Sequence, residues 1–284
     1  MKKDEAEFCR EIERRVRRTI KKYSNLSPDA RVIAACSGGK DSTTALYLAS
    51  KYFKRVTALL VNEGIPHYRD ETEESLKKFC NQNGIPLKII SFKREFGITL
   101  QEIVKKTNLN ACSACGVLRR WLINKYSRGY DCLITGHNLD DEAEAVLMNL
   151  FKTNLRELKA QKPYLSELKQ EGLTPRLKPL FFISEEQIIK YAKIKGIPAP
   201  AKQCPYRKNA FRRSVESEIS ILKRENPKIL KDIITTHICL INRIKTPKQV
   251  IGRCKTCGMP SGERECRACQ IISRIGETRC SQTL

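Results

Sequence analysis

Residues 31–42 read RVIAACSGGKDS: an apolar run of strand length, two glycines, and then Lys40, Asp41 and Ser42 at the start of an amphipathic segment. The two glycines allow a tight turn and let the backbone approach a ligand closely. The N–H groups of such a turn, together with the start of a helix, form a cradle for an anion. We therefore predict a phosphate-binding turn between a strand and a helix. The alternative is an ordinary glycine turn in which Ser42 caps the helix.

Apolar runs of strand length also alternate with helical patterns after this turn. The alternation predicts a Rossmann-like open parallel α/β sheet, whose ligand lies beyond the carboxyl ends of the strands. A polar excursion is expected over residues 152–176. We expect strands over residues 31–36, 55–61, 87–92, 131–135 and 177–182. We expect helices over residues 4–23, from the glycine turn through Ala49, over 70–83 and 140–151, from a capping box at Ser184 and Gln187, over 211–226, and after Pro227 to about residue 244.

The composition describes a basic globular protein. The chain has 284 residues with 54 Lys or Arg and 31 Asp or Glu, so its formal net charge is +23. Hydrophobic residues make up 40% and charged residues 30%, which fits a globular chain and excludes a disordered one. No apolar run approaches the ~20 residues that span a bilayer, and residues 1–5 lack the pattern of a secretory signal. We expect a cytoplasmic protein that binds no membrane. The positive charge favours a nucleic-acid partner over a merely soluble basic surface.

Thirteen cysteines in a cytosolic chain predict core thiols, metal ligands or redox groups, because that compartment keeps thiols reduced. The two Cys-x-x-Cys pairs between residues 254 and 269 are separated by eight residues, a pattern typical of a structural, tetrahedral Zn²⁺ site. Its ligands would be Cys254, Cys257, Cys266 and Cys269. Apolar surroundings predict buried free thiols at Cys36, Cys80, Cys132 and Cys239. No role is assigned to Cys9 or Cys280.

Two further segments carry side chains of catalytic type. Cys112-x-x-Cys115-Gly116 is a redox pair or half a zinc site when taken alone, and Cys204 stands far downstream; we expect both outside regular elements. The fourth strand is followed by Gly-His-Asn-Leu-Asp-Asp-Glu over residues 136–142. Its Asp140 and Asp141 either cap the next helix or face the predicted phosphate site and bind Mg²⁺ there, for which carboxylate oxygens are suited.

The turn differs from the mononucleotide P-loop Gly-x-x-x-x-Gly-Lys-Ser/Thr. Its Ser-Gly-Gly-x-Asp-Ser resembles the signature of the PP-loop ATP pyrophosphatases, which join AMP from ATP to a substrate oxygen. Over about residues 28–272 the motifs narrow the resemblance to the tRNA 2-thiouridine synthetases of the TtuA type, which include archaeal and eukaryotic wobble-uridine enzymes, with TtcA more distant. The motifs that carry it are residues 37–42, Cys-x-x-Cys-Gly followed by Arg119 and Arg120, residues 136–142, Cys-Pro-Tyr at 204–206, and Arg212-Arg213 on a helix.

This resemblance implies a tRNA 2-thiouridine synthase that adenylates a uridine C2 oxygen and then inserts sulfur. It implies ATP, Mg²⁺, a [4Fe–4S] cluster and Zn²⁺ as cofactors, tRNA as substrate, and a ubiquitin-like thiocarboxylated carrier or free sulfide as sulfur donor. It also allows a homodimer. The implied cluster ligands are Cys112, Cys115 and Cys204; a zinc site or a persulfide or disulfide relay are the alternatives. The implied catalytic residues are Asp41, Asp140, Asp141 and Arg119. The implied ATP-binding residues are Ala35, Ser37, Gly38, Gly39, Lys40, Asp41, Ser42, Asn62, Gly64, Gly136 and His137.

We divide the chain into an N-terminal helix (1–27), a PP-loop catalytic domain (28–203), a basic helical segment (204–248) and a zinc ribbon with its tail (249–284). The TtuA type usually begins with another zinc ribbon, but this N-terminus offers only Cys9, so we expect that ribbon to be absent. We hypothesise RNA contacts, with a solvated helix face as the alternative, for Arg207, Lys208, Arg212 and Arg213. Two other functions stay open: a different PP-loop enzyme that adenylates tRNA, and a non-catalytic RNA-binding subunit of a thiolation complex.

Overall fold

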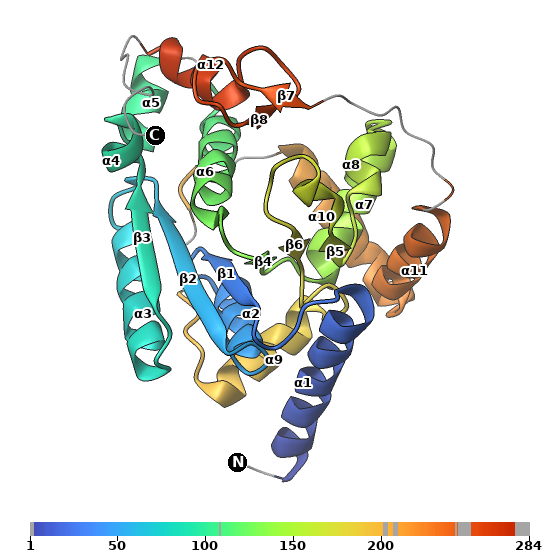
Figure 1. Cartoon of the computed structure of the whole chain (residues 1–284). Helices are drawn as coiled ribbons and strands as arrows, with labels where there is room; N and C mark the ends of the chain where they lie inside the picture. Colours follow the sequence, from blue (N-terminus) through green and yellow to red (C-terminus); the bar gives the residue numbers. More distant parts are fainter. Residues whose placement is uncertain are drawn as a thin grey trace.

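The computed structural model describes residues 3–107, 109–200, 204–206, 210–241, 243 and 251–275. Its centre is a six-stranded sheet in the order β3-β2-β1-β4-β6-β5 (Figure 1). All its strand pairs are parallel except β5 with β6. The predicted α/β class and mostly parallel sheet are therefore confirmed. The strands are β1 (Arg31–Cys36), β2 (Arg55–Asn62), β3 (Leu87–Ser91), β4 (Cys132–Thr135), β5 (Tyr164–Leu165) and β6 (Arg176–Leu177).

The strand order places the candidate site. The chain builds the sheet from β1 through β2 to β3 and then returns, so that β4 pairs with the free side of β1. Ala35 is opposite Thr135 in this pair, so the segments that begin at Ser37 and Gly136 leave the sheet side by side. Such a reversal in an open parallel sheet is where ligands bind, beyond the carboxyl ends of the strands.

One face of the sheet is covered by α1 (Lys3–Tyr23), α2 (Lys40–Ser50), α3 (Tyr68–Gln82) and α9 (Glu185–Lys195). The N-terminal helix joins this core because its apolar residues recur every four positions: Ile12, Val16 and Ile20 are at most 2% exposed. Ser184 caps α9 and forms a capping box with Gln187, as predicted.

The opposite face packs against α4 (Phe92–Phe96), α5 (Leu100–Lys106), α6 (Ala111–Ser127) and a C-terminal ribbon of β7 (Gly252–Arg253), β8 (Pro260–Ser261) and α12 (Arg267–Ser273). Helix α6 corrects one expectation, because Cys112 and Cys115 lie in its first turns. Its start is stabilised by Asn110, whose side chain accepts a hydrogen bond of 3.1 Å from Ser113 N. Its buried residues Leu118 and Leu122 are one helical turn apart.

A third core joins α7 (Leu139–Phe151), α8 (Leu155–Lys159), α10 (Ala210–Glu225) and α11 (Ile229–Ile241) beyond β4. The predicted interruption at Pro227 separates α10 from α11. Cys239 corrects another expectation, because it is exposed on α11, while Cys36, Cys80 and Cys132 are buried as predicted. Within the described residues, no helix has the length and apolar character needed to cross a membrane.

The strand predicted over residues 177–182 is shorter than expected. Only Arg176–Leu177 pair with β4, and the chain then turns, with Phe181 N donating to Lys178 O and Ile183 N donating to Leu180 O. Pro179 has no N–H to donate to a neighbouring strand, which explains why an apolar run does not continue as a strand here. The predicted polar excursion contains α8, β5 and a short 3₁₀ turn, η1 (Glu167–Lys169).

Candidate active site

The glycine turn between β1 and α2 has the backbone of a phosphate cradle. Gly38 has φ +81°, and a Cβ at this position would lie 2.5 Å from the carbonyl oxygen of Thr72 on α3. The Ser42 hydroxyl accepts a hydrogen bond of 3.1 Å from Ser37 N and donates one of 3.0 Å to Gly39 O. Only glycine therefore fits at position 38, and the Ser42 hydroxyl connects the two sides of the turn by hydrogen bonds.

The end of β4 forms the other wall of the turn. A Cβ on Gly136 would lie 2.6 Å from Ser42 Cα, so the two loops touch through their backbones. Asn138 donates a hydrogen bond of 3.2 Å to Asp41 Oδ1, and Lys40 Nζ lies 3.1 Å from Asp41 Oδ2. Burial raises the pKa of Asp41, and Lys40 opposes that rise. Asp41 is thus a half-buried carboxylate shared by both loops.

Asp140 and Asp141 are already bound to protein groups. Asp141 forms a capping box with Asn138 at the start of α7 and an ion pair of 2.7 Å with Arg212. Asp140 accepts a hydrogen bond of 2.8 Å from Glu185 N and forms an ion pair of 3.1 Å with Lys223. The geometry therefore shows a capping role for Asp141. Contacts of either residue with ATP or Mg²⁺ stay predictions.

A buried ion pair that sequence reasoning missed connects the turn to the end of β2. Arg69 on α3 donates to Glu63 Oε2 from Nε at 2.8 Å and to Ser37 O from Nη1 at 2.7 Å. The side chains of Arg69 and Glu63 are only 3% and 1% exposed. Glu63 Oε1 is buried without a hydrogen-bond partner, and Arg119 Nη1 lies 3.7 Å from it. No local sequence pattern marks this pairing.

The loop that contains Glu63 is held by its own side chains. Asn62 accepts a hydrogen bond of 2.8 Å from Gly64 N and donates one of 2.7 Å to Glu73. The structure thus places Asn62 and Gly64 at the carboxyl end of β2, next to the strand that carries the turn. Their contact with ATP stays a prediction.

The three separated cysteines converge beside this ion pair. Cys112 Sγ donates a hydrogen bond of 2.6 Å to Tyr206 O, so the segment with Cys204 lies against the start of α6. Cys115 and Cys204 pack against the same core. Burial raises the pKa of Cys115 to about 12, and the negative charges of Glu63 and Cys204 add to that rise. Residues from α6 and from a segment after α9 thus meet at one place.

This all-sulfur donor set fits an iron–sulfur cluster, because thiolates are the usual ligands of such clusters. Among the described residues, the sulfurs of Cys112, Cys115 and Cys204 do not form a group as tight as that of the C-terminal ribbon.

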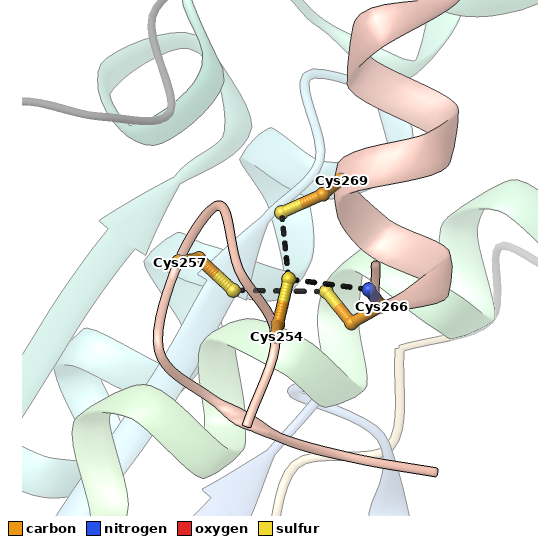
Figure 2. Close-up of side chains that lie close together, drawn as sticks. All are labelled: Cys254, Cys257, Cys266 and Cys269. Atoms are coloured by element: carbon orange, nitrogen blue, oxygen red, sulfur yellow. Dashed lines mark hydrogen bonds between the residues drawn. The ribbon is translucent and has the colours of Figure 1, made fainter. Parts of the chain in front are cut away.

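The ribbon cysteines surround a space for one metal ion, as Figure 2 shows. The Sγ atoms of Cys254 and Cys269 lie 3.9 Å apart, and those of Cys257 and Cys266 lie 3.7 Å apart. Tetrahedral Zn²⁺ with Zn–S bonds of about 2.3 Å requires sulfur separations of about 3.8 Å. The four residues therefore fit the predicted zinc site.

The candidate RNA-binding arginines have different environments. Arg212 is bound to Asp141 and to Glu144 on α7, at 2.7 and 2.8 Å, whereas Arg213 is exposed. Arg207 and Lys208 lie outside the described residues, as does Cys280. The geometry thus favours Arg213 over Arg212 as an RNA contact.

His137 follows β4, and its Nδ1 lies 3.1 Å from the Thr135 hydroxyl. His137 is exposed, and desolvation by the neighbouring segments together with the positive charges of Lys178 and Arg176 lowers its pKa.

Comparison with known proteins agrees with this arrangement. The model of the family described as PP-loop domain matches residues 10–219. The tRNA-5-methyluridine(54) 2-sulfurtransferase of Pyrococcus horikoshii is 33% identical, covering 94% of this chain and 86% of the relative. The tRNA 2-thiolation protein NcsA of Haloferax volcanii is 31% identical, covering 94% of this chain and 91% of the relative.

A solved structure extends the likeness to the fold. The U34-tRNA thiolase NcsA from Methanococcus maripaludis, described with its [4Fe–4S] cluster, superposes with a TM-score of 0.81 at 32% identity. The match covers 97% of this chain and 91% of the thiolase. The chain therefore belongs to the PP-loop family and, within it, to the tRNA 2-thiolation proteins.

Proposed function

We propose that this protein is an ATP-dependent tRNA 2-thiouridine synthase. The observation that carries the proposal is that the phosphate turn and the three-cysteine site lie at the same edge of the sheet. They are joined by the Arg69–Glu63 pair, which contacts Ser37 O on one side and lies beside Cys115 on the other. An enzyme that activates a base with ATP and then replaces its oxygen with sulfur needs these two sites close together.

In the first half of the reaction, the glycine turn binds the phosphates of ATP and exposes the α-phosphorus. The C2 oxygen of the uridine attacks this phosphorus, pyrophosphate leaves, and the N3 proton is lost. The product carries AMP on the former carbonyl oxygen. The backbone N–H groups of the turn and Lys40 stabilise the charge that develops on the phosphates. We assign ATP contacts to Ala35, Ser37–Ser42, Asn62, Gly64, Gly136 and His137.

In the second half, a sulfur nucleophile adds to C2 and AMP leaves with the original oxygen, which yields 2-thiouridine. Adenylation makes this possible because a phosphate ester is a far better leaving group than a carbonyl oxygen. Arg119 lies one helical turn after Cys115 on α6 and 3.7 Å from Glu63 Oε1, and we assign its positive charge to stabilising the oxygen as it leaves. The sulfur donor that we propose is free sulfide, or a thiocarboxylated ubiquitin-like carrier whose carbon–sulfur bond is cleaved by water, which leaves the carrier with a carboxylate and releases sulfide.

Cys112, Cys115 and Cys204 would hold the [4Fe–4S] cluster, and three thiolates leave one iron without a protein ligand. When bound, the cluster would offer that iron to a sulfur species. The ribbon would hold Zn²⁺ in a closed structural role. We assign Mg²⁺ to the ATP phosphates near Asp41, Asp140 and Asp141. Like the rice relative named cytoplasmic tRNA 2-thiolation protein 1, the protein would act in the cytoplasm, with a homodimer as the assembly to test.

The test separates the two half-reactions. We expect Asp41→Asn to stop both tRNA-dependent pyrophosphate release and 2-thiouridine formation, because a misplaced α-phosphorus costs orders of magnitude in rate. We expect Cys204→Ser to stop 2-thiouridine formation but keep measurable pyrophosphate release. Nucleoside mass spectrometry and a pyrophosphate assay measure the two steps, and circular dichroism checks folding. A folded Cys204→Ser protein that thiolates tRNA at the wild-type rate would contradict the proposed sulfur site.

A further inference from the structure

Two arginines near the candidate active site have no acceptor among the residues that the structure describes. Most cations around His137 are compensated by carboxylates: Lys178 lies 2.8 Å from Glu142, and Arg212 is held by two carboxylates of α7. Among the described residues, neither Arg176 nor Arg120 forms an ion pair or a side-chain hydrogen bond. The Nε atom of Arg176 is buried and has no partner. A buried N–H donor without an acceptor destabilises the folded protein, because it has lost its hydrogen bond to water. A bound anion would supply the missing acceptor.

The sheet register places Arg176 on the α6 side of the sheet. Arg176 is opposite Leu133 in the parallel β4–β6 pair, and neighbouring residues in register point to the same face. Leu133 packs with Leu118 and Leu122 of α6. The guanidinium of Arg120 folds back along α6, because its Nη2 lies 4.0 Å from the position of a Cβ on Gly116. Arg176 thus lies on the side of the sheet that α6 covers, and Arg120 lies on α6 beside Gly116.

The electrostatics agree with this placement. Arg120 repels Arg176, and burial together with that repulsion lowers the pKa of Arg176, while Glu157 on α8 attracts it without forming an ion pair. In Figure 1, β6 lies between α6 and α8. Two guanidinium groups close enough to repel each other favour a ligand with full negative charge, and the planar donors of arginine match a phosphate.

The position distinguishes this anion from the phosphates of ATP. The glycine turn follows β1, whereas Arg176 is on β6, two strands away and thus about 10 Å from β1. Arg176 also precedes the carboxyl end of the sheet, because its partner Leu133 lies two residues before Thr135. A uridine must leave its base stack to reach the α-phosphorus, and its flanking backbone must then be held beside the site.

We propose that Arg176 and Arg120 form a subsite for a phosphodiester of the RNA strand that carries the target uridine. The subsite rests on the proposed function for the identity of the RNA. It would position the strand rather than read its sequence, since phosphate contacts carry no base information.

The experiment measures binding, independently of thiolation. Anticodon and T-arm stem-loops are the probes, because the named relatives act at positions 34 and 54. In each RNA, the phosphates next to the target uridine are replaced one at a time by neutral methylphosphonates. For the wild-type protein, we expect one replacement to weaken binding about tenfold or more, as for loss of a charged hydrogen bond.

Arg176→Gln should weaken binding of the unmodified RNA by a similar factor and remove the sensitivity to that one replacement. Arg120→Gln, which changes an exposed side chain, repeats the test if Arg176→Gln does not fold. Arg18→Gln on α1 is the matched control: it removes the same charge from an exposed arginine and should preserve the sensitivity.

Three results would overturn the subsite. One is that every methylphosphonate replacement changes RNA binding by the same factor in the wild-type protein and in both arginine variants. The second is the absence of binding to either RNA. The third is unchanged RNA binding with weaker binding of inorganic pyrophosphate, which would assign the arginines to the leaving group of ATP. Failure of the proposed function looks different: coupling between Arg176 and a phosphate would persist, while mass spectrometry would find no 2-thiouridine in full-length tRNA.

Discussion

Arg69 shows how a single side chain holds the candidate site together. It donates to Ser37 O at the glycine turn, to Glu63 at the end of β2 and to Thr72 Oγ1 within α3. All three contacts are made by a side chain that is 3% exposed. Removing one partner of a buried ion pair is strongly destabilising, because the remaining charge loses its compensation without regaining water.

At this scale, we expect Arg69→Leu to lower the free energy of unfolding by about 3 kcal/mol or more, since it leaves the Glu63 carboxylate buried. The matched control is Lys78→Ala, which removes the exposed partner of Glu74; the two side chains are 71% and 67% exposed. That change should cost less than about 1 kcal/mol. Urea unfolding followed by circular dichroism measures both values. Equal costs for the two variants would show that the buried pair is not a major source of stability.

The two candidate metal sites lie on two neighbouring elements, helix α6 and the C-terminal ribbon. The first turns of α6 supply Cys112 and Cys115, and the same helix packs against α12 of the ribbon. The two candidate metal sites therefore share a core but no ligand. Each should fill independently if both are sites of the predicted kinds.

We accordingly expect anaerobically purified protein to contain about four irons and one zinc per chain. Cys112→Ala should lose the iron and its broad visible absorption but retain the zinc. Cys257→Ser should lose the zinc and destabilise the ribbon, because a structural zinc site contributes folding energy. Cys239→Ser, at an exposed thiol on α11, is the control and should retain both metals. Metal analysis that finds zinc at both sites and no iron would contradict the cluster.

The charge of the whole molecule concerns its partner rather than its fold. The 54 Lys and Arg residues outnumber the 31 Asp and Glu residues, so one-to-one pairing of every acidic residue would still leave the formal net charge of +23 uncompensated. Many Lys and Arg side chains therefore remain to meet a polyanion. Neutralising phosphates releases counterions, and binding then weakens steeply with salt. The ion pairs of Arg212 show that some of this charge is already used inside the protein.

We expect the affinity for tRNA to fall by about a thousandfold between 50 and 200 mM salt, the loss typical of about six phosphate contacts. Arg213→Gln should reduce the slope of log K against log salt by about 0.9, as for one duplex phosphate. Arg212→Gln should leave the slope nearly unchanged, because its charge is compensated by Asp141 and Glu144. Filter binding over a salt series measures all three slopes. A larger change for Arg212 than for Arg213 would reverse this assignment.

The sequence by itself determined the features that depend on residues close together in the chain. The turn at residues 37–42, the strands before it and beside it, the capping box at Ser184 and the four ribbon cysteines all follow from local patterns. Their physical basis is hydrogen bonding, backbone freedom and ligand spacing within a few residues. For the set of Cys112, Cys115 and Cys204, the residues alone left alternatives open, and only the family resemblance named the three together.

The tertiary structure decided everything that depends on strand order. The pairing of β4 with β1 brings Asn138 to Asp41 across 97 residues. The segment after α9 returns to the start of α6, where Tyr206 O accepts a hydrogen bond from Cys112 Sγ, 94 residues earlier in the chain. Nor does any local pattern show that Arg69 pairs with Glu63, or that Arg176 Nε has no hydrogen-bond partner in the described part of the chain. Such contacts arise only when the sheet assembles, because separated segments reach the same place through the sheet and its crossovers rather than through their own sequence.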